Sequence, residues 1–147
     1  MQSKLQPSDN CLDLIKRFES CDLHVYPDQN DLPTIGFGHL LRPNEMHLET
    51  IVQEVADHLL SCDVQSAAND VNTMVHVPLT QNQVDALCSF VFNIGGSRFR
   101  TSTMLIYLNA NRILDAANEL LKWDHAAGKV SNGLETRREA ERSLFLS

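Results

Sequence analysis

The hydrophobic pattern changes from helix to strand and back to helix near the N-terminus, and this change constrains the fold more than any other feature of the chain. Apolar residues recur at helical spacing in the segment 8–20, where Leu12, Ile15 and Phe18 mark the repeat. The segment 34–39 alternates instead, as a half-buried strand does. The later repeats are helical, which predicts an α+β fold, mostly helical with a small N-terminal antiparallel sheet. We expect these later helices at about 47–72, 80–95, 102–110, 112–123 and after the 128–133 loop.

Two glycines lie on one face of the predicted strand. Ile35 and Phe37 share the other face, whereas Gly36 and Gly38 alternate with them on the side of Thr34. Glycine weakens a strand, and it is tolerated where another backbone or a ligand approaches closely. A bulge or a tight bend explains the glycines equally well.

Two carboxyl groups and one hydroxyl stand close together in this region. Glu19 falls in the last turn of the predicted helix, Asp28 lies in a turn over 27–31, and Thr34 begins the predicted strand. Glycosidic bonds are commonly cut by one protonated and one ionised carboxyl group. The negative end of the helix dipole favours the protonated form of Glu19, which suits a general acid. Acidic residues near turns are more often solvated surface groups, so the three residue types alone do not decide the function.

The spacing of these residues carries a family resemblance. Eight residues separate Glu19 from Asp28, five separate Asp28 from Thr34, and the segment Ile35–Leu41 follows. This pattern resembles the catalytic signature of the phage-type lysozymes, glycoside hydrolase family 24. Three further segments look like the endolysins of tailed phages, at 79–87, 90–95 and 133–145.

The resemblance covers nearly the whole chain and implies one lysozyme-like domain, 1–147, with a cleft between two lobes. The N-terminal lobe would span about 1–60 and hold the catalytic motif. A helix over about 47–72 would link it to a helical C-terminal lobe over about 73–147. A length of 147 residues suits one compact domain of this kind.

The resemblance also implies a mechanism. Glu19 would protonate the glycosidic oxygen, Asp28 would stay ionised and activate water, and Thr34 would hold that water. Such lysozymes invert the anomeric centre, which predicts carboxyl groups about 6.5 to 9.5 Å apart. The substrate would be the β-1,4 bond between N-acetylmuramic acid and N-acetylglucosamine in peptidoglycan. The positions that match the family's sugar contacts are Leu40, Phe92, Asn93 and Ser102.

Three alternatives share parts of this pattern. A lytic transglycosylase needs the acid but no water-activating carboxylate, so the presence of both Asp28 and Thr34 favours hydrolysis. A non-catalytic peptidoglycan-binding homologue would keep the fold and lose the acid, whereas Glu19 is intact. An antibacterial toxin or a virion-associated lysozyme would share the chemistry and differ in delivery.

Histidines and arginines are expected to play structural roles. The scattered histidines form no metal-binding pattern, so we expect neither a metal nor another cofactor. His39 shares the strand face of Ile35, and the resemblance suggests Asp63 as its acidic partner. On the last helix, Arg138 and Glu141 invite a partly buried ion pair, and Arg137 is a candidate to lie near Glu19. For each arginine taken singly, a solvated helix charge is the better prediction.

Composition bears on partners and location. The formal net charge of −7 predicts weak attraction to anionic cell walls and argues against nucleic acid as a partner. The N-terminus, Met1–Asn10, is polar, and neither a signal peptide nor an apolar run that could span a membrane is evident. We expect a monomer that stays in the host bacterial cytoplasm until a holin, as the resemblance implies, releases it to the wall. All four cysteines are expected to be reduced, with Cys11, Cys62 and Cys88 packed in helices as small hydrophobic residues.

Overall fold

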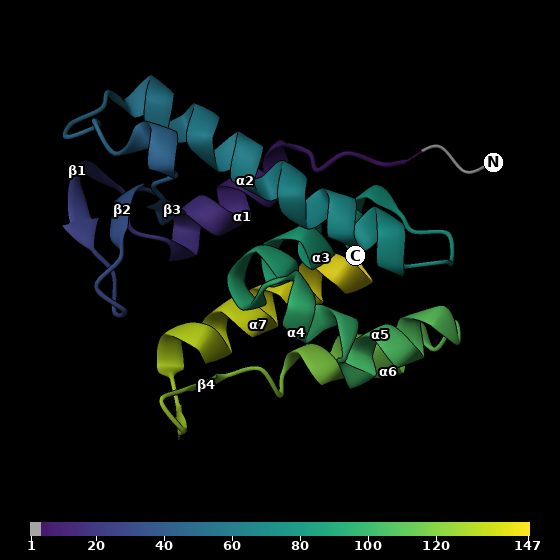
Figure 1. The fold of residues 1–147 in the computed structure, drawn as a ribbon. Helices are drawn as coiled ribbons and strands as arrows, with labels where there is room; N and C mark the ends of the chain where they lie inside the picture. Colours follow the sequence, from purple (N-terminus) through teal and green to yellow (C-terminus); the bar gives the residue numbers. More distant parts are fainter. Residues whose placement is uncertain (1–3) are drawn as a thin grey trace.

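The computed structural model describes residues 4–147 and shows a small sheet beside a larger group of helices (Figure 1). Residues 1–3, which begin the polar segment Met1–Asn10, lie outside the described residues. The elements are α1 (Asp9–Phe18), β1 (Asp22–Pro27), β2 (Pro33–Gly36), β3 (His39–Leu40), a 3-10 turn η1 (Pro43–Glu45), α2 (Gln53–Met74), α3 (Gln81–Ile94), α4 (Gly96–Arg100), α5 (Thr103–Asn109), α6 (Ile113–Leu120), β4 (His125–Ala126), β5 (Lys129–Val130) and α7 (Asn132–Leu146). The predicted α+β class is confirmed.

The N-terminal sheet is antiparallel, in the order β1-β2-β3. Thr34 of β2 pairs with Tyr26 of β1 on one side and with Leu40 of β3 on the other, so the middle strand sets the register of both neighbouring strands. The prediction of one strand over 34–39 was wrong, because β2 ends at Gly36 and the chain bends before β3. Gly36 and Gly38 have φ values of +66° and +78°, which an L side chain rarely adopts. The tight bend is therefore the main reason for the glycines.

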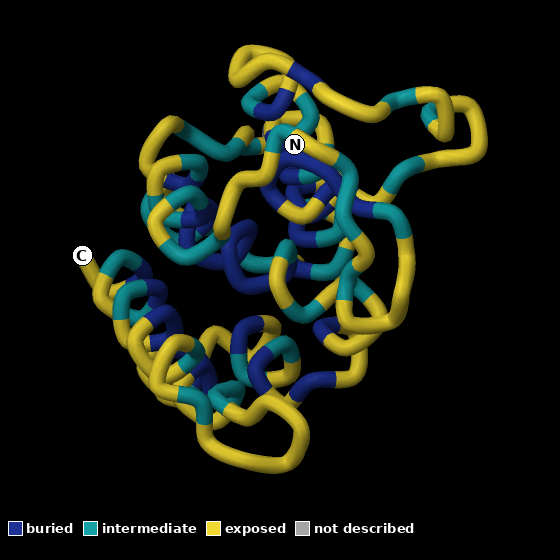
Figure 2. Tube along the Cα trace, turned by 90° about the vertical axis from the view of Figure 1, so that its left-hand side faces the viewer, coloured by how far each residue is buried: buried dark blue, intermediate teal, exposed yellow. Residues whose placement is uncertain are grey.

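Helix α3 is the centre of the core. It packs against α2, α7 and α1, and its residues 84–91 are all buried. The predicted capping box is present, since the Thr80 hydroxyl accepts from the Gln83 amide at 3.1 Å and the Gln83 side chain accepts from the Thr80 amide at 2.9 Å. Gly95 ends the helix with φ +89°. In Figure 2 the buried positions gather where the helices face one another.

Several predicted boundaries change. Helix α2 begins at Gln53 rather than near 47, because part of the preceding segment runs beside β1, where His24 and Thr50 form a bridge. The 128–133 loop is partly a hairpin of β4 and β5, whose bend places Ala127 and Gly128 at positive φ. Such two-residue strands carry too short an apolar pattern to be detected from sequence.

Two further expectations concern the state of the cysteines and membrane-spanning helices. All four cysteines in residues 4–147 are free thiols. Cys11 and Cys88 are buried as expected, but Cys62 is exposed, so its predicted packing was wrong. Within the described residues, none of the helices combines the length and the apolar character required to cross a bilayer.

Candidate active site

Glu19 stands directly after α1, on the wall of a cleft. The helix ends one residue earlier than expected, so Glu19 is the C-cap, and its amide donates to the carbonyl of Ile15 at 2.9 Å. Its side chain is 26% exposed. The Nη1 of Arg137, a residue of α7, donates to its Oε1 at 2.8 Å. A partly exposed carboxyl group with one fixed oxygen can still offer the other oxygen to a ligand in the cleft.

Asp28 and Thr34 are placed by the turn between β1 and β2. The Oδ1 of Asp28 accepts from the amides of Asn30 at 2.8 Å and Leu32 at 2.9 Å, which closes the turn on the carboxylate. Thr34 is buried on β2, and its hydroxyl donates to the carbonyl of Leu32 at 2.9 Å. One carboxylate oxygen of Asp28 thus fixes the local backbone, and the same turn holds the Thr34 hydroxyl.

The structure brings these three residues together in one cleft of about 630 Å³ between the sheet and helices α2 to α4. Three of the four positions expected to contact sugar line the same cleft, namely Leu40, Phe92 and Asn93. Ser102 does not lie among the lining residues. It is the N-cap of α5, where its hydroxyl accepts from the Leu105 amide at 3.1 Å and donates to the Phe99 carbonyl at 2.7 Å.

Tyr26 is a cleft residue that the sequence reasoning missed. It precedes the turn on β1 and pairs with Thr34. Burial raises the pKa of Tyr26, and the nearby carboxylates of Glu19, Asp22 and Asp28 raise it further. Its phenol therefore remains a neutral hydrogen-bond donor beside the acidic pair. Its position one residue before the Pro27–Asp28 turn was a signal that could have identified it.

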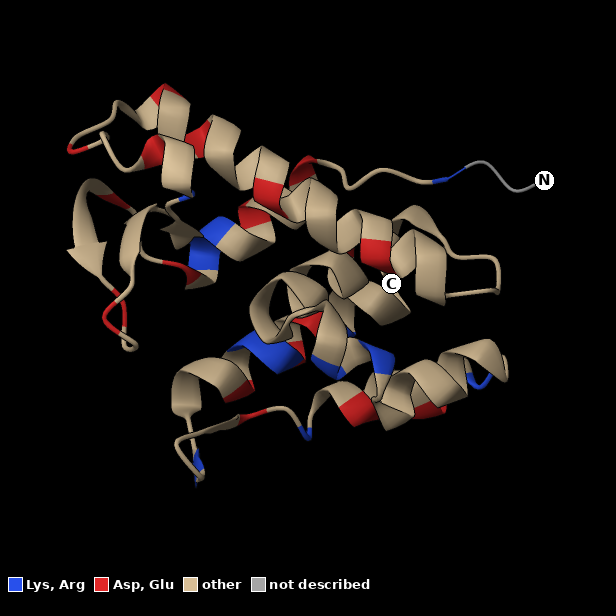
Figure 3. Cartoon of the chain, in the orientation of Figure 1, with Lys and Arg blue, Asp and Glu red and all other residues tan. Residues whose placement is uncertain are grey.

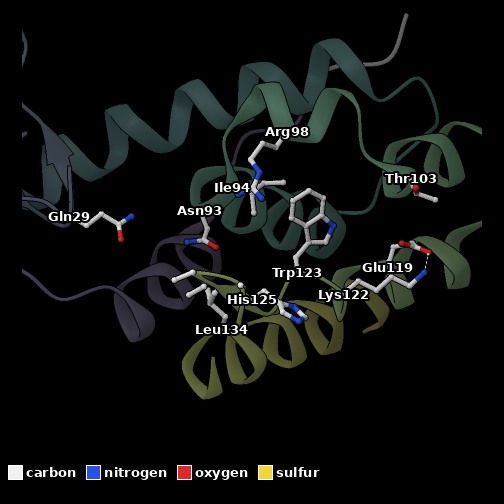
Figure 4. A pocket seen from close by; sticks show the side chains of 13 residues that line it. Gln29, Asn93, Ile94, Arg98, Thr103, Glu119, Lys122, Trp123, His125 and Leu134 are labelled. Atoms are coloured by element: carbon white, nitrogen blue, oxygen red, sulfur yellow. Dashed lines mark hydrogen bonds and ion pairs between the residues drawn. The ribbon is translucent and has the colours of Figure 1, made fainter. Parts of the chain in front are cut away.

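A second hollow of about 760 Å³ adjoins the cleft (Figure 4). Gln29 and Asn93 line both spaces, so the hollow lies next to the cleft. The hollow extends along the helical side past the Trp123 indole, over which the Arg98 guanidinium lies 5.0 Å from the ring centroid. An indole surface and the neighbouring cation can bind both an apolar group and an anion.

A buried polar network lies behind Glu19. Arg137 and Arg138 are 3% and 0% exposed, so the prediction of solvated helix charges was wrong for both. The expected ion pair between Arg138 and Glu141 is present, and it is fully buried. The expected contact of Arg137 with Glu19 is also confirmed.

His39 has two acidic partners where one was expected. Its Nδ1 lies 2.9 Å from Asp63, as the resemblance suggested, and its Nε2 lies 3.0 Å from Glu45 on η1. Burial by itself would lower the pKa of His39, but the hydrogen bonds to Glu45 and Asp63 outweigh it and raise that pKa. His39 therefore joins the sheet to both η1 and α2.

The cleft wall formed by α2 is acidic. This helix carries Glu54, Asp57, Asp63 and Asp70 and no Lys or Arg (Figure 3). Asp63 and Asp70 line the cleft, together with Glu19 and Asp28. The surface that a polymer meets on this side is therefore negatively charged.

Known proteins share both the sequence and the fold. A model of the phage lysozyme family matches residues 16–141. The endolysin of Salmonella phage P22 is 42% identical over 146 residues, which cover 97% of this chain and 99% of the phage protein. The endolysin of Bacillus phage B103 is 43% identical over 139 residues, and the alignment covers 92% of this chain and 52% of that protein. This chain thus spans about half the length of the B103 protein.

Two solved structures superimpose over almost the whole chain. The muramidase domain of SpmX from Asticaccaulis excentricus has a TM-score of 0.87 and 36% identity, covering 97% of this chain and 98% of that domain. A variant of P22 lysozyme has a TM-score of 0.85 and 42% identity, covering 97% of this chain and 99% of the other.

Proposed function

We propose that this chain, which belongs to the phage lysozyme family, is a muramidase that hydrolyses the β-1,4 bond between N-acetylmuramic acid and N-acetylglucosamine in peptidoglycan during host lysis. One observation carries the assignment of the site. Glu19, Asp28 and Thr34, which are separated in the sequence, line a single cleft.

In the proposed reaction, Glu19 donates its proton to the glycosidic oxygen as the bond to the anomeric carbon breaks. A water molecule held by Asp28 and Thr34 attacks that carbon from the opposite face and transfers a proton to the Asp28 carboxylate, so the product has inverted configuration. The turn amides that donate to Asp28 Oδ1 hold this carboxyl group in a fixed position near the developing positive charge.

Several neighbouring residues support this mechanism by holding the acid or the glycan in place. The Arg137 guanidinium fixes one oxygen of Glu19, which restricts the rotamers of the acid. Phe92 and Asn93 line the cleft from α3, and we propose that they contact the glycan together with Leu40.

We further propose a functional division between the sheet side and the helical side of the cleft. Helix α1 packs mainly against α3 and α7, so Glu19 is anchored on the helical side, whereas Asp28 and Thr34 belong to the sheet. A small change in the angle between these parts would alter the spacing of the acid and the water site.

We propose that the protein is a monomer and that it reaches the cell wall after a holin permeabilises the membrane.

Purified peptidoglycan stripped of outer membrane tests the assignment. Glu19→Gln keeps an acceptor for Arg137 and removes the proton donor, so we expect turnover to fall by about 100-fold or more with little change in unfolding temperature. Glu54→Gln, at an exposed position on α2, is the matched control and should retain parental activity.

The products distinguish the alternatives. Reducing-end muramic acid products from the parental protein support hydrolysis, and an initial product of inverted anomeric configuration supports the roles of Asp28 and Thr34. Anhydro sugars would identify a transglycosylase. Binding of wall fragments without release by the parental protein would contradict the proposed activity.

A further inference from the structure

A layer of buried charge lies directly behind Glu19. The Arg137 side chain contacts Glu19 through Nη1, and its Nη2 donates to the Ser89 carbonyl at 3.1 Å. On its other side, Nε lies 3.4 Å from Oε2 of Glu141. Glu19 and Glu141 therefore share one guanidinium, although one lines the cleft and the other is fully buried.

Glu141 is held from three directions. The Ser89 hydroxyl donates to its Oε2 at 2.6 Å, and Arg138 donates to its Oε1. Arg138 continues the network, because its Nη2 donates to Asn93 Oδ1 and its Nε donates to the Trp123 carbonyl at 2.9 Å. Asn93 lines both the cleft and the adjoining hollow, and Trp123 lines the hollow (Figure 4).

The four charged groups balance when both carboxyl groups are ionised. Two guanidiniums then face two carboxylates, and protonation of Glu19 leaves one positive charge in excess. A buried carboxylate competes with Glu19 for Arg137, which limits how strongly Arg137 stabilises ionised Glu19. A guanidinium without this competitor would make the acid give up its proton at lower pH.

We propose that Glu141 is a positioning residue for the reaction, which shares Arg137 with Glu19 and so weakens the hold of that guanidinium on the acid, and which aligns Asn93 through Arg138. This inference rests on the proposed role of Glu19 as the general acid. Glu141 itself touches no part of the cleft, so its effect passes through the two arginines.

The other titratable groups around this network come from α1, α3 and β1. Burial raises the pKa of Cys88 to about 12 and also raises that of Cys11, so both thiols stay neutral at working pH. Asp85 adds a buried negative charge on α3. Tyr26 faces Glu19 from β1 with a raised pKa. Glu141 is thus the acidic group in this set that bonds to both arginines.

The test compares Glu141→Gln with Glu139→Gln, an exposed glutamate on the same helix. In Glu141→Gln the alkaline limb of the activity profile should move to lower pH by about one unit, with activity recovering at acidic pH. Glu139→Gln should keep the parental profile. A loss of activity by the same factor at every pH would mean that Glu141 is only structural, and it would overturn the proposal.

A second variant restores the charge balance. Arg138→Met combined with Glu141→Gln removes one charge of each sign, so the alkaline limb should return most of the way to the parental pH. Its KM should rise relative to Glu141→Gln alone, because Asn93 loses its donor. If the alkaline limb of the double variant stays at the pH found for Glu141→Gln alone, the charge-sharing mechanism is contradicted.

A measurement on the unmodified protein covers the case in which these variants fail to fold. Carboxyl carbon NMR of glutamate-labelled protein follows Glu19 and Glu141 through a pH titration. The proposal requires Glu141 to remain ionised while Glu19 takes up its proton, and the reverse order would overturn it. An inactive parental protein would refute the muramidase assignment, whereas an active one with an unshifted Glu141→Gln profile would refute this inference alone.

Discussion

At the scale of single residues, His39 illustrates how burial and pairing compete. It is 4% exposed, yet it contacts carboxylates on both ring nitrogens. The amide of Arg42 and the ring of His39 both lower the pKa of Glu45. The ion pair between His39 and Glu45 is therefore most favourable between the low pH at which Glu45 protonates and the pH, raised above 6.5, at which His39 loses its charge.

We predict that His39→Gln changes the pH dependence of stability. The pKa of His39 is raised on folding, so its contribution is complete below the unfolded value of about 6.5 and disappears as pH rises through the folded value. We expect the variant to lose about 2 kcal/mol of unfolding free energy near pH 6 and progressively less at higher pH. Urea denaturation from pH 5 to 9 measures this difference. The exposed His47→Gln should follow the parental curve, and a constant deficit in His39→Gln would refute the linkage.

At the scale of secondary structure, the bend between β2 and β3 couples backbone conformation to the cleft. Gly38 adopts φ +78°, and a Cβ built there would lie 4.0 Å from Oε2 of Glu19. There is space for a methyl group, so the requirement for glycine comes from the backbone rather than from crowding. The bend also sets the register between Ile35 and His39.

We predict opposite effects for alanine at two glycines. Gly38→Ala should lower the unfolding free energy by about 1 to 2 kcal/mol, because a left-handed backbone is unfavourable for alanine, and it should reduce turnover by shifting the bend beside Glu19. Gly133→Ala lies in the first turn of α7, has no positive φ and meets only Ser131 Oγ at 3.8 Å. It should be neutral or stabilising. Thermal denaturation and wall-clearing rates compare the two, and equal stability of both variants would refute the strain at Gly38.

At the scale of the whole molecule, charge opposes the encounter with the substrate. The formal net charge is −7, and the α2 wall of the cleft carries carboxylates. Peptidoglycan with free stem-peptide carboxylates is also anionic. Long-range repulsion should therefore slow association, and short-range contacts in the cleft must supply the affinity.

We predict that wall clearing accelerates as salt rises from low values to about 0.15 M, where the screening length falls to about 8 Å. The rise should appear in kcat/KM rather than in kcat, because screening acts on association. Wall material whose stem-peptide carboxylates have been amidated is the control and should show little salt dependence. A rate that falls steadily with salt would mean that a local basic surface, rather than net charge, governs the encounter.

Sequence reasoning succeeded where the signal was local. The α+β class, the capping box at Thr80 and the burial of Cys11 were predicted from local patterns and are confirmed. It failed for the bend after Gly36 and for the short hairpin before α7, because two-residue strands have too little periodicity. The sugar-contacting roles of Leu40, Phe92, Asn93 and Ser102 remain predictions.

Residue spacing predicted which groups perform the chemistry, because Glu19, Asp28 and Thr34 follow one another closely on consecutive local elements. Only the tertiary structure decided how those groups are supported. Ser89 on α3 donates to Glu141 on α7, and Arg138 on α7 donates to Asn93 on α3. Such contacts depend on how distant elements pack, and a charged residue on a helix has the same sequence signature whether its face is buried or solvated.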